Sequence, residues 1–262
     1  MSFVAHTAVI GDGPKTAFVL HGILGAGRNW RSFSRRLAAA RPDLRLVLID
    51  QRNHGDSPAA NAPHTLDACA DDLERLGRAE FVIGHSFGGK VALTLARRRP
   101  AGLSQAVVLD AWPGIGSDGT TLSVIAALKT VEVPAPSRDA VRKQLSQQGL
   151  GPELVTWLLT SMRRTDIGWV WKYNLNGVDA MISDYLQTDL WPWLESRDGG
   201  PRIDIVRAEK NERWTPEALD RLDAISPTSD VHSHVVSNAG HWLHVDNPDG
   251  LLAILSGALR SD

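Results

Sequence analysis

The run Gly-His-Ser-Phe-Gly at residues 84–88 constrains the fold of this chain more than any other feature. An apolar stretch at residues 81–83 ends at this run, and a helical pattern starts directly after it, at residues 90–96. A strand that turns this sharply into a helix holds Ser86 in a strained backbone conformation, and the two glycines leave room for the turn. The sequence therefore predicts that the Ser86 hydroxyl projects from the carboxyl end of a strand, toward the amides that begin the next helix.

Strand and helix patterns alternate along most of the chain. Continuous apolar runs are typical of strands that are covered on both faces. The alternation predicts an α/β fold with a mostly parallel central sheet, right-handed crossovers and helices on both faces. Ligands bind such sheets beyond the carboxyl ends of the strands. The predicted strands cover residues 3–10, 16–21, 44–49, 80–85, 106–109, 201–206 and 230–236, and the polar residues at strand ends are His21, Asp50, Ser86 and Asp110.

The alternation breaks at residues 113–200, which contain helical patterns, several prolines and five of the nine tryptophans. We expect this segment to form an all-helical cap, inserted into an α/β core of residues 1–112 and 201–262. The tryptophans either face the site beneath the cap or fill the small core of the cap itself. Glycines at its two ends are expected to act as flexible joints: Gly114, Gly116, Gly119, Gly199 and Gly200.

Further motifs follow one another in a fixed order. They are His-Gly-Ile-Leu-Gly at 21–25, Asn-Trp at 29–30, Asp-x-Arg-Asn-x-Gly-x-Ser at 50–57, Gly-His-Ser-Phe-Gly-Gly at 84–89 and Asn-Ala-Gly-His-Trp at 238–242. This set resembles the α/β-hydrolase superfamily across nearly the whole chain, and most of all the bacterial carboxylesterases and thioesterases that act on short acyl chains. The resemblance implies a serine hydrolase that needs no metal or organic cofactor. A serine at position 86 argues against the branches of the superfamily that use an aspartate nucleophile.

A serine hydroxyl needs a base within hydrogen-bond reach and an acid that orients the base. The resemblance implies the chain order serine, acid, histidine, and His241, between the last predicted strand and the closing helix, fits the base. Asp110 is the favoured acid, because it ends the strand that follows the helix after Ser86. In much of the superfamily the acid follows the next strand, near Asn211, and this leaves Glu212 as the alternative acid, with Glu209 as a further substitute.

Two backbone amides are needed to stabilise the negative oxygen of the transition state. Phe87, directly after Ser86, is expected to supply one amide, and Ile23 the other, with Gly22 allowing close approach of the backbone. Large aromatic side chains near the site would shorten the pocket, so we expect a small or short-acyl substrate. The predicted pocket residues are Trp112, Trp169, Trp171 and Trp242.

Several functions remain open for such a site. The leading prediction is hydrolysis of a carboxylic ester or thioester through an acyl-enzyme on Ser86. The same residues also serve carbon–carbon bond hydrolysis and the cleavage of a small amide, and a ligand-binding or receptor-like protein can keep them while turning over slowly. Turnover of a generic activated ester separates the enzyme from the binding protein.

Composition limits the partners. The 262 residues carry a formal net charge of −2, which gives no electrostatic reason to bind nucleic acid or an anionic membrane. The single cysteine, Cys69, excludes an intrachain disulfide and a cysteine-rich metal site. Neither a secretory signal nor a stretch long enough to span a bilayer is visible, so a soluble cytoplasmic protein is expected. The oligomeric state is left open.

Two competing motifs are weaker. Gly-x-Gly-x-x-Gly at residues 114–119 matches a dinucleotide-binding fingerprint, but Trp112 and Pro113 separate it from the strand. No strand ending in an acidic residue follows about 20 residues later, so the match is interpreted as accidental. His232 and His234 alternate along a predicted strand, but no further ligand at suitable spacing completes a zinc site.

Overall fold

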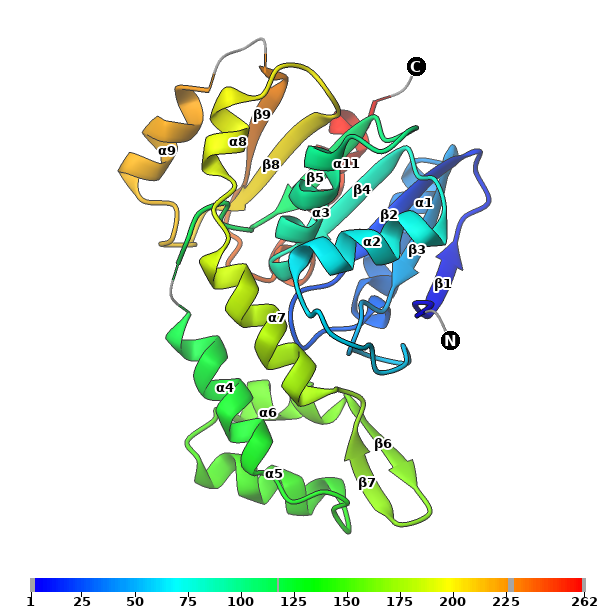
Figure 1. Cartoon of the computed structure of the whole chain (residues 1–262), viewed down its shortest axis with the longest axis vertical. Helices are drawn as coiled ribbons and strands as arrows, with labels where there is room; N and C mark the ends of the chain where they lie inside the picture. The colour runs from blue at the N-terminus through cyan, green and yellow to red at the C-terminus, as the bar shows by residue number, and fades with distance from the viewer. Residues whose placement is uncertain (1–2, 117, 226–228, 261–262) are drawn as a thin grey trace.

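A seven-stranded sheet forms the centre of the computed structural model, which describes residues 3–116, 118–225 and 229–260 (Figure 1). The outer strand β1 pairs antiparallel with β3, and the other neighbouring strands of this sheet are parallel. The predicted α/β class with a mostly parallel sheet is therefore confirmed. In sheet order the strands are β1 (Thr7–Ile10), β3 (Leu44–Ile49), β2 (Lys15–Leu20), β4 (Phe81–His85), β5 (Gln105–Leu109), β8 (Arg202–Ala208) and β9 (Val231–Val236).

Helices cover both faces of the sheet. In Figure 1, α2 (Leu66–Leu76) and α3 (Phe87–Arg98) lie in front of it, and α11 (Pro248–Ala258) lies behind it with α1 (Arg31–Ala40). Alternate side chains of a strand point to opposite faces, so each strand contributes to two cores. In β2, Phe18 and Leu20 join the core that contains α2 and α3, whereas Ala17 and Val19 join the core that contains α1 and α11. The described residues of this part of the chain also form the short helices η1 (Gly27–Trp30), α9 (Pro216–Asp223) and α10 (Leu243–Asp246).

The path of the chain reverses beside β4. From β2 the chain crosses to β3 on one side, and from β3 it crosses back to β4 on the other side of β2. The loops after β2 and β4 therefore leave the same edge of the sheet toward opposite faces. In a parallel sheet, this arrangement leaves a crevice between the two loops where a ligand can bind. Because Leu20 lies beside Gly84 and His85 beside Leu109 in the strand register, the loops after these three strands meet at the same edge.

The insertion, residues 113–200, joins β5 to β8. The sequence predicts an all-helical segment here, but the insertion also contains a short hairpin. Met162 pairs with Trp171 across a two-stranded antiparallel hairpin. The sequence signal for it is the alternation of large side chains at Trp169 and Trp171, with the turn allowed by Gly168 at φ 133°. The elements of the insertion are α4 (Gly119–Thr130), α5 (Arg138–Gln147), α6 (Pro152–Leu159), β6 (Met162–Thr165), β7 (Gly168–Trp171), α7 (Leu175–Gln187) and α8 (Trp191–Ser196).

A buried lysine ties the insertion to the core. Lys90 of α3 donates hydrogen bonds from Nζ to the carbonyl oxygens of Gly114 (2.7 Å), Tyr185 (2.6 Å) and Thr188 (2.8 Å). Burial lowers the pKa of Lys90 to about 8, against the opposing effect of nearby aspartates, so at pH 7 most molecules keep all three ammonium protons. Gly114 is packed rather than loose, because a Cβ there would lie 2.8 Å from the Trp191 ring. This packing speaks against the expected role of Gly114 as a flexible joint.

Within the described residues, no helix combines the length and the apolar composition that crossing a membrane requires. The predicted core limits at residues 1 and 262 and Ser117 of the accidental fingerprint lie outside the described residues.

Candidate active site

Ser86 lies at the sharp turn between β4 and α3. Its backbone has φ 54° and ψ −118°, a conformation that a residue with a side chain rarely adopts, and its amide donates to the Leu109 carbonyl oxygen at 2.9 Å. The two glycines of the motif are required by space. A Cβ on Gly84 would collide with the Gly88 carbonyl, and one on Gly88 would lie 2.7 Å from the His21 carbonyl oxygen. The predicted strand–turn–helix geometry around Ser86 is present.

Asp110 follows β5 and contacts His241. The side chain of Asp110 is fully buried, and its Oδ2 lies 2.8 Å from Nδ1 of His241. Asn211 Nδ2 donates to the same oxygen at 2.7 Å, while the Ala208 amide (2.9 Å) and Trp214 Nε1 (3.3 Å) donate to Oδ1. A carboxylate with this many donors is held in one orientation. Since the carboxylate only accepts, Nδ1 of His241 carries a proton and Nε2 is free to accept one.

The alternative acids lie elsewhere. Glu212 is exposed, and Glu209 accepts the backbone amide of Asn238 at 2.6 Å. Asn211, which stands near the position expected for an aspartate, contacts Asp110 instead. Of the acids considered, the structure brings Asp110 to His241.

Buried neutral histidines hold the loops around Ser86. The Leu24 amide donates to Nε2 of His54 at 3.1 Å, and burial lowers the pKa of His54 to about 3, which keeps the ring neutral. His85 donates from Nε2 to the His241 carbonyl oxygen at 2.7 Å, and burial likewise lowers the pKa of His85 well below its ordinary value. These rings fix the loops that carry Ile23 and His241.

One cavity of about 340 Å³ contains Ser86 and His241 in its wall. Ile23 and Phe87 also line it. Gly22 lets the Ile23 loop approach the serine, because a Cβ on Gly22 would lie 3.2 Å from Ser86 Cβ. The rest of the wall contains both apolar and polar residues. The apolar residues are Leu24, Val124, Leu154, Trp157, Ile182, Tyr185 and Trp242, and the polar residues are Asp118, Thr120, Thr121, Asn211 and Arg213.

Three of the four tryptophans expected in the pocket lie outside this wall. Trp112 packs edge-on between Trp191 (5.5 Å) and Trp214 (5.7 Å) and lines a neighbouring hollow. The ring of Trp169 packs under the Arg138 guanidinium, 4.4 Å from its centre, and Trp171 is buried against another aromatic ring. Packing within the insertion and at its base therefore accounts for these three rings. Trp242 does line the cavity.

Sequence reasoning missed the residues of α6 that line the cavity. Leu154 and Trp157 are one helical turn apart and face the cavity, and the Trp157 ring meets Trp242 edge-on at 5.1 Å. Val155 and Leu158 of the same helix are fully buried in the core that the insertion shares with α2 and α3. The sequence signal that could have identified them is that this helix has apolar residues on two faces, of which packing in the core uses only one.

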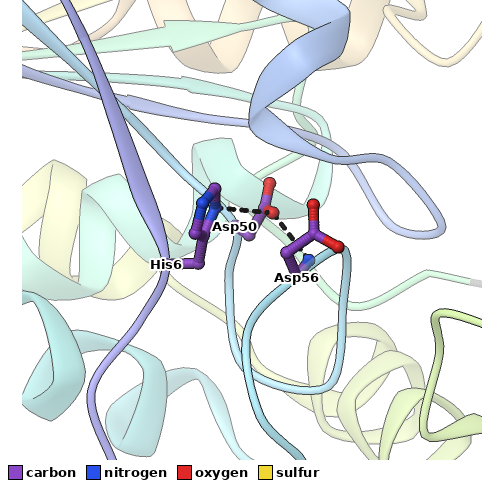
Figure 2. Close-up of side chains that lie close together, drawn as sticks. All are labelled: His6, Asp50 and Asp56. Atoms are coloured by element: carbon purple, nitrogen blue, oxygen red, sulfur yellow. Dashed lines mark hydrogen bonds and ion pairs between the residues drawn. The ribbon is translucent and has the colours of Figure 1, made fainter.

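His6, Asp50 and Asp56 lie close together where the chain leaves the carboxyl end of β3 (Figure 2). The Asp50 carboxylate accepts the amides of Gly27 (2.7 Å) and Asp56 (2.8 Å), with Nδ1 of His6 at 3.2 Å. Asp56 forms an ion pair with Lys172 at 2.6 Å. Because the carboxylates already have protein partners, the cluster is explained as a support for the loop at 50–57.

His232 and His234 do not converge on one site. His232 Nε2 lies 2.9 Å from Asp230, and His234 Nε2 lies 2.7 Å from Asp204. Each ring is thus used by a different carboxylate.

Comparison with known proteins relates the chain to one family. Residues 17–254 match the family described as the alpha/beta hydrolase family. The chain is 30% identical to the sn-1-specific diacylglycerol lipase ABHD11 of Mus musculus over 270 residues, covering 98% of this chain and 85% of the mouse protein. It is 27% identical to esterase YbfF of Escherichia coli (strain K12) over 244 residues, covering 89% of each.

Solved structures agree with this likeness. A marine microorganism esterase superposes with a TM-score of 0.82 at 27% identity, covering 96% of this chain and 98% of the esterase. The segment that matches the family, residues 17–254, includes Ser86, Asp110 and His241 and contains most of the sheet. Together with the strand–turn–helix geometry at Ser86, these matches identify the chain as an enzyme of the α/β-hydrolase family, with relatives that are named esterases and lipases.

Proposed function

We propose that this enzyme hydrolyses a carboxylic ester or thioester with a small or short acyl group through an acyl-enzyme on Ser86. The observation that carries the proposal is the arrangement of three side chains. Ser86 occupies a strained turn, the buried Asp110 holds Nδ1 of His241, and Ser86 and His241 line the same cavity. In such an arrangement the histidine can take the serine proton and later return it.

In the first half of the proposed reaction, Ser86 Oγ attacks the carbonyl carbon while its proton passes to Nε2 of His241. The negative oxygen that forms is stabilised by the backbone amides of Ile23 and Phe87. His241 then gives the proton to the departing alcohol or thiol, and the acyl group remains on Ser86. In the second half a water molecule attacks the acyl-enzyme in the same way, releasing the acid and restoring the serine.

The short-acyl preference is supported by the size of the cavity and by its aromatic wall. The volume of about 340 Å³ is at the small end of ligand pockets. Trp157 of the insertion and Trp242 of the core meet across it. We therefore propose that residues 113–200 act as a cap that shortens the acyl site and excludes water from it.

Turnover of activated esters tests the proposal. Wild type should hydrolyse an acetyl or butyryl ester, and Ser86→Ala should lose this activity while keeping the melting temperature of wild type. A Ser86→Ala variant that retains wild-type turnover would remove the serine mechanism. A wild type that binds esters without turning them over would favour the ligand-binding alternative.

A further inference from the structure

The loop between β8 and α9 contacts both Asp110 and the insertion. Asn211 and Trp214 of this loop donate to the two oxygens of the Asp110 carboxylate. Arg213, between them, forms an ion pair with Asp118 at the base of α4. Asn211, Arg213 and Asp118 all line the cavity that contains Ser86 and His241.

Both ends of the Asn211 amide are occupied. Nδ2 donates to Asp110 Oδ2 at 2.7 Å, the same oxygen that lies 2.8 Å from His241. Oδ1 accepts the backbone amide of Arg213 at 3.0 Å. Turning the amide over would place a donor against the Arg213 amide and an acceptor against the carboxylate. The two bonds therefore select one orientation of Asn211 and hold the carboxylate oxygen that faces His241.

Arg213 and Asp118 connect this amide to the insertion. The guanidinium and the carboxylate lie 2.7 Å apart, and the Asp118 side chain is only 14% exposed. Asp118 also caps α4, accepting the Thr121 amide at 2.9 Å. Although burial opposes it, hydrogen bonding to Arg213 and Thr121 holds the pKa of Asp118 below its ordinary value. Arg213 thus has a charged, well-fixed partner on α4.

We propose that Asn211 and Arg213 are positioning residues that link the insertion to the acid of the triad. Asp118 fixes Arg213, the backbone of Arg213 fixes Asn211, and Asn211 fixes Asp110 against His241. We name this set, Asp118–Arg213–Asn211, the cap–acid link. The proposal rests on the function proposed above, since it assigns a purpose to the orientation of Asp110. It implies that a shift of α4 on its base changes the rate of the chemical step.

A double-mutant cycle tests the cap–acid link. Asn211→Ala should lower kcat about tenfold with little change in KM, because one charge-assisted bond to Asp110 is lost. Asp118→Asn keeps a good helix cap and should lower kcat about threefold through Arg213. The link requires that Asp118→Asn cause no further loss when Asn211 is already Ala. The link would be overturned if the loss of kcat in the double variant equalled the product of the two single losses. A wild-type kcat in Asn211→Ala would overturn it as well.

The matched control is a second ion pair between the insertion and the core. Asp56 of the core pairs with Lys172, directly after β7, at 2.6 Å. Asp56→Asn also removes one ion pair between these parts but touches neither Arg213 nor Asp110, so kcat should stay at the wild-type value. A loss of kcat in Asp56→Asn equal to that in Asp118→Asn would mean that the insertion acts without the link.

Proton NMR gives a readout that does not depend on turnover. The low-field resonance of the proton shared by His241 and Asp110 should shift in Asn211→Ala and in Asp118→Asn, and stay in place in Asp56→Asn. If wild type shows this resonance but hydrolyses no ester, the proposed function fails while the link remains testable. An unchanged resonance in Asn211→Ala, with the melting temperature preserved, would reject the link itself.

Discussion

When Asp110 is replaced with asparagine, the hydrogen bonds around the present carboxylate determine how the new amide is oriented. The new amide must put its NH₂ group where one oxygen stood. At Oδ1 it would face the Ala208 amide (2.9 Å) and Trp214 Nε1 (3.3 Å), neither of which can accept a hydrogen bond. At Oδ2 it would face His241, whose ring can move its proton to the other nitrogen, and Asn211, which can turn its amide only by losing its exposed hydrogen bond with the Arg213 amide. We therefore expect the NH₂ group to face His241.

That orientation disables the base. With its Nδ1 accepting from the new NH₂ group, His241 carries its proton on Nε2 and cannot take the proton of Ser86. The wrong tautomer lowers kcat by about 10⁴ in a related triad. A loss of this size corresponds to about 5.4 kcal/mol of activation free energy. We expect the same magnitude here, because the alternative orientation would leave two buried donors unpaired.

The assay compares kcat and KM for an activated short-chain ester in wild type, Asp110→Asn and Glu212→Gln. Glu212 is exposed, so its substitution should leave kcat within about twofold, as surface changes do. Melting curves establish that both variants are folded. An Asp110→Asn enzyme with more than a tenth of wild-type kcat, or a large loss in Glu212→Gln, would refute this reasoning.

Further predictions concern the cavity, the core and pH. Trp157→Ala should move the acyl-chain optimum to longer chains in a series of esters, because it removes a wall residue, whereas Trp169→Ala should leave it in place; equal profiles would reject the cap proposal. Lys90→Met should lower the melting temperature by about 6–12 °C, because three carbonyl oxygens lose their donor, and a loss below about 2 °C would contradict this. The folded-state pKa of His54 is about 3, below the unfolded value of 6.5, so unfolded chains bind more protons as pH falls. Urea unfolding should show about 2 kcal/mol less stability at pH 5 than at pH 7 from this residue, and His54→Gln should show a smaller difference.

Much of the core could be predicted from the sequence. Buried parallel strands are continuous apolar runs, and each was found within a few residues of its observed position. The need for glycine on both sides of Ser86 could also be predicted, since the neighbouring backbone leaves no space for a Cβ. The encounter of Asp110 with His241 followed from the strand ends, because parallel strands bring distant residues to one edge.

The insertion was harder to predict. Its hairpin at 162–171 is short, and the sequence predicts Trp169 and Trp171 as pocket residues, although their rings pack inside the insertion. Which side chains reach the cavity depends on how α6 lies against the core, and a helix pattern alone does not set that placement. The contact of Arg213 with Asp118 spans 95 residues and depends on the same placement.

The most direct test of the central claim is the mass of the enzyme during turnover. Wild type is mixed with a short-chain activated ester, stopped with acid within the first turnovers, and digested for mass spectrometry. The account predicts that the peptide containing Ser86 gains the mass of one acyl group and that Ser86→Ala gains none. Ester turnover with no acylated peptide, or with the acyl group on another residue, would contradict the account.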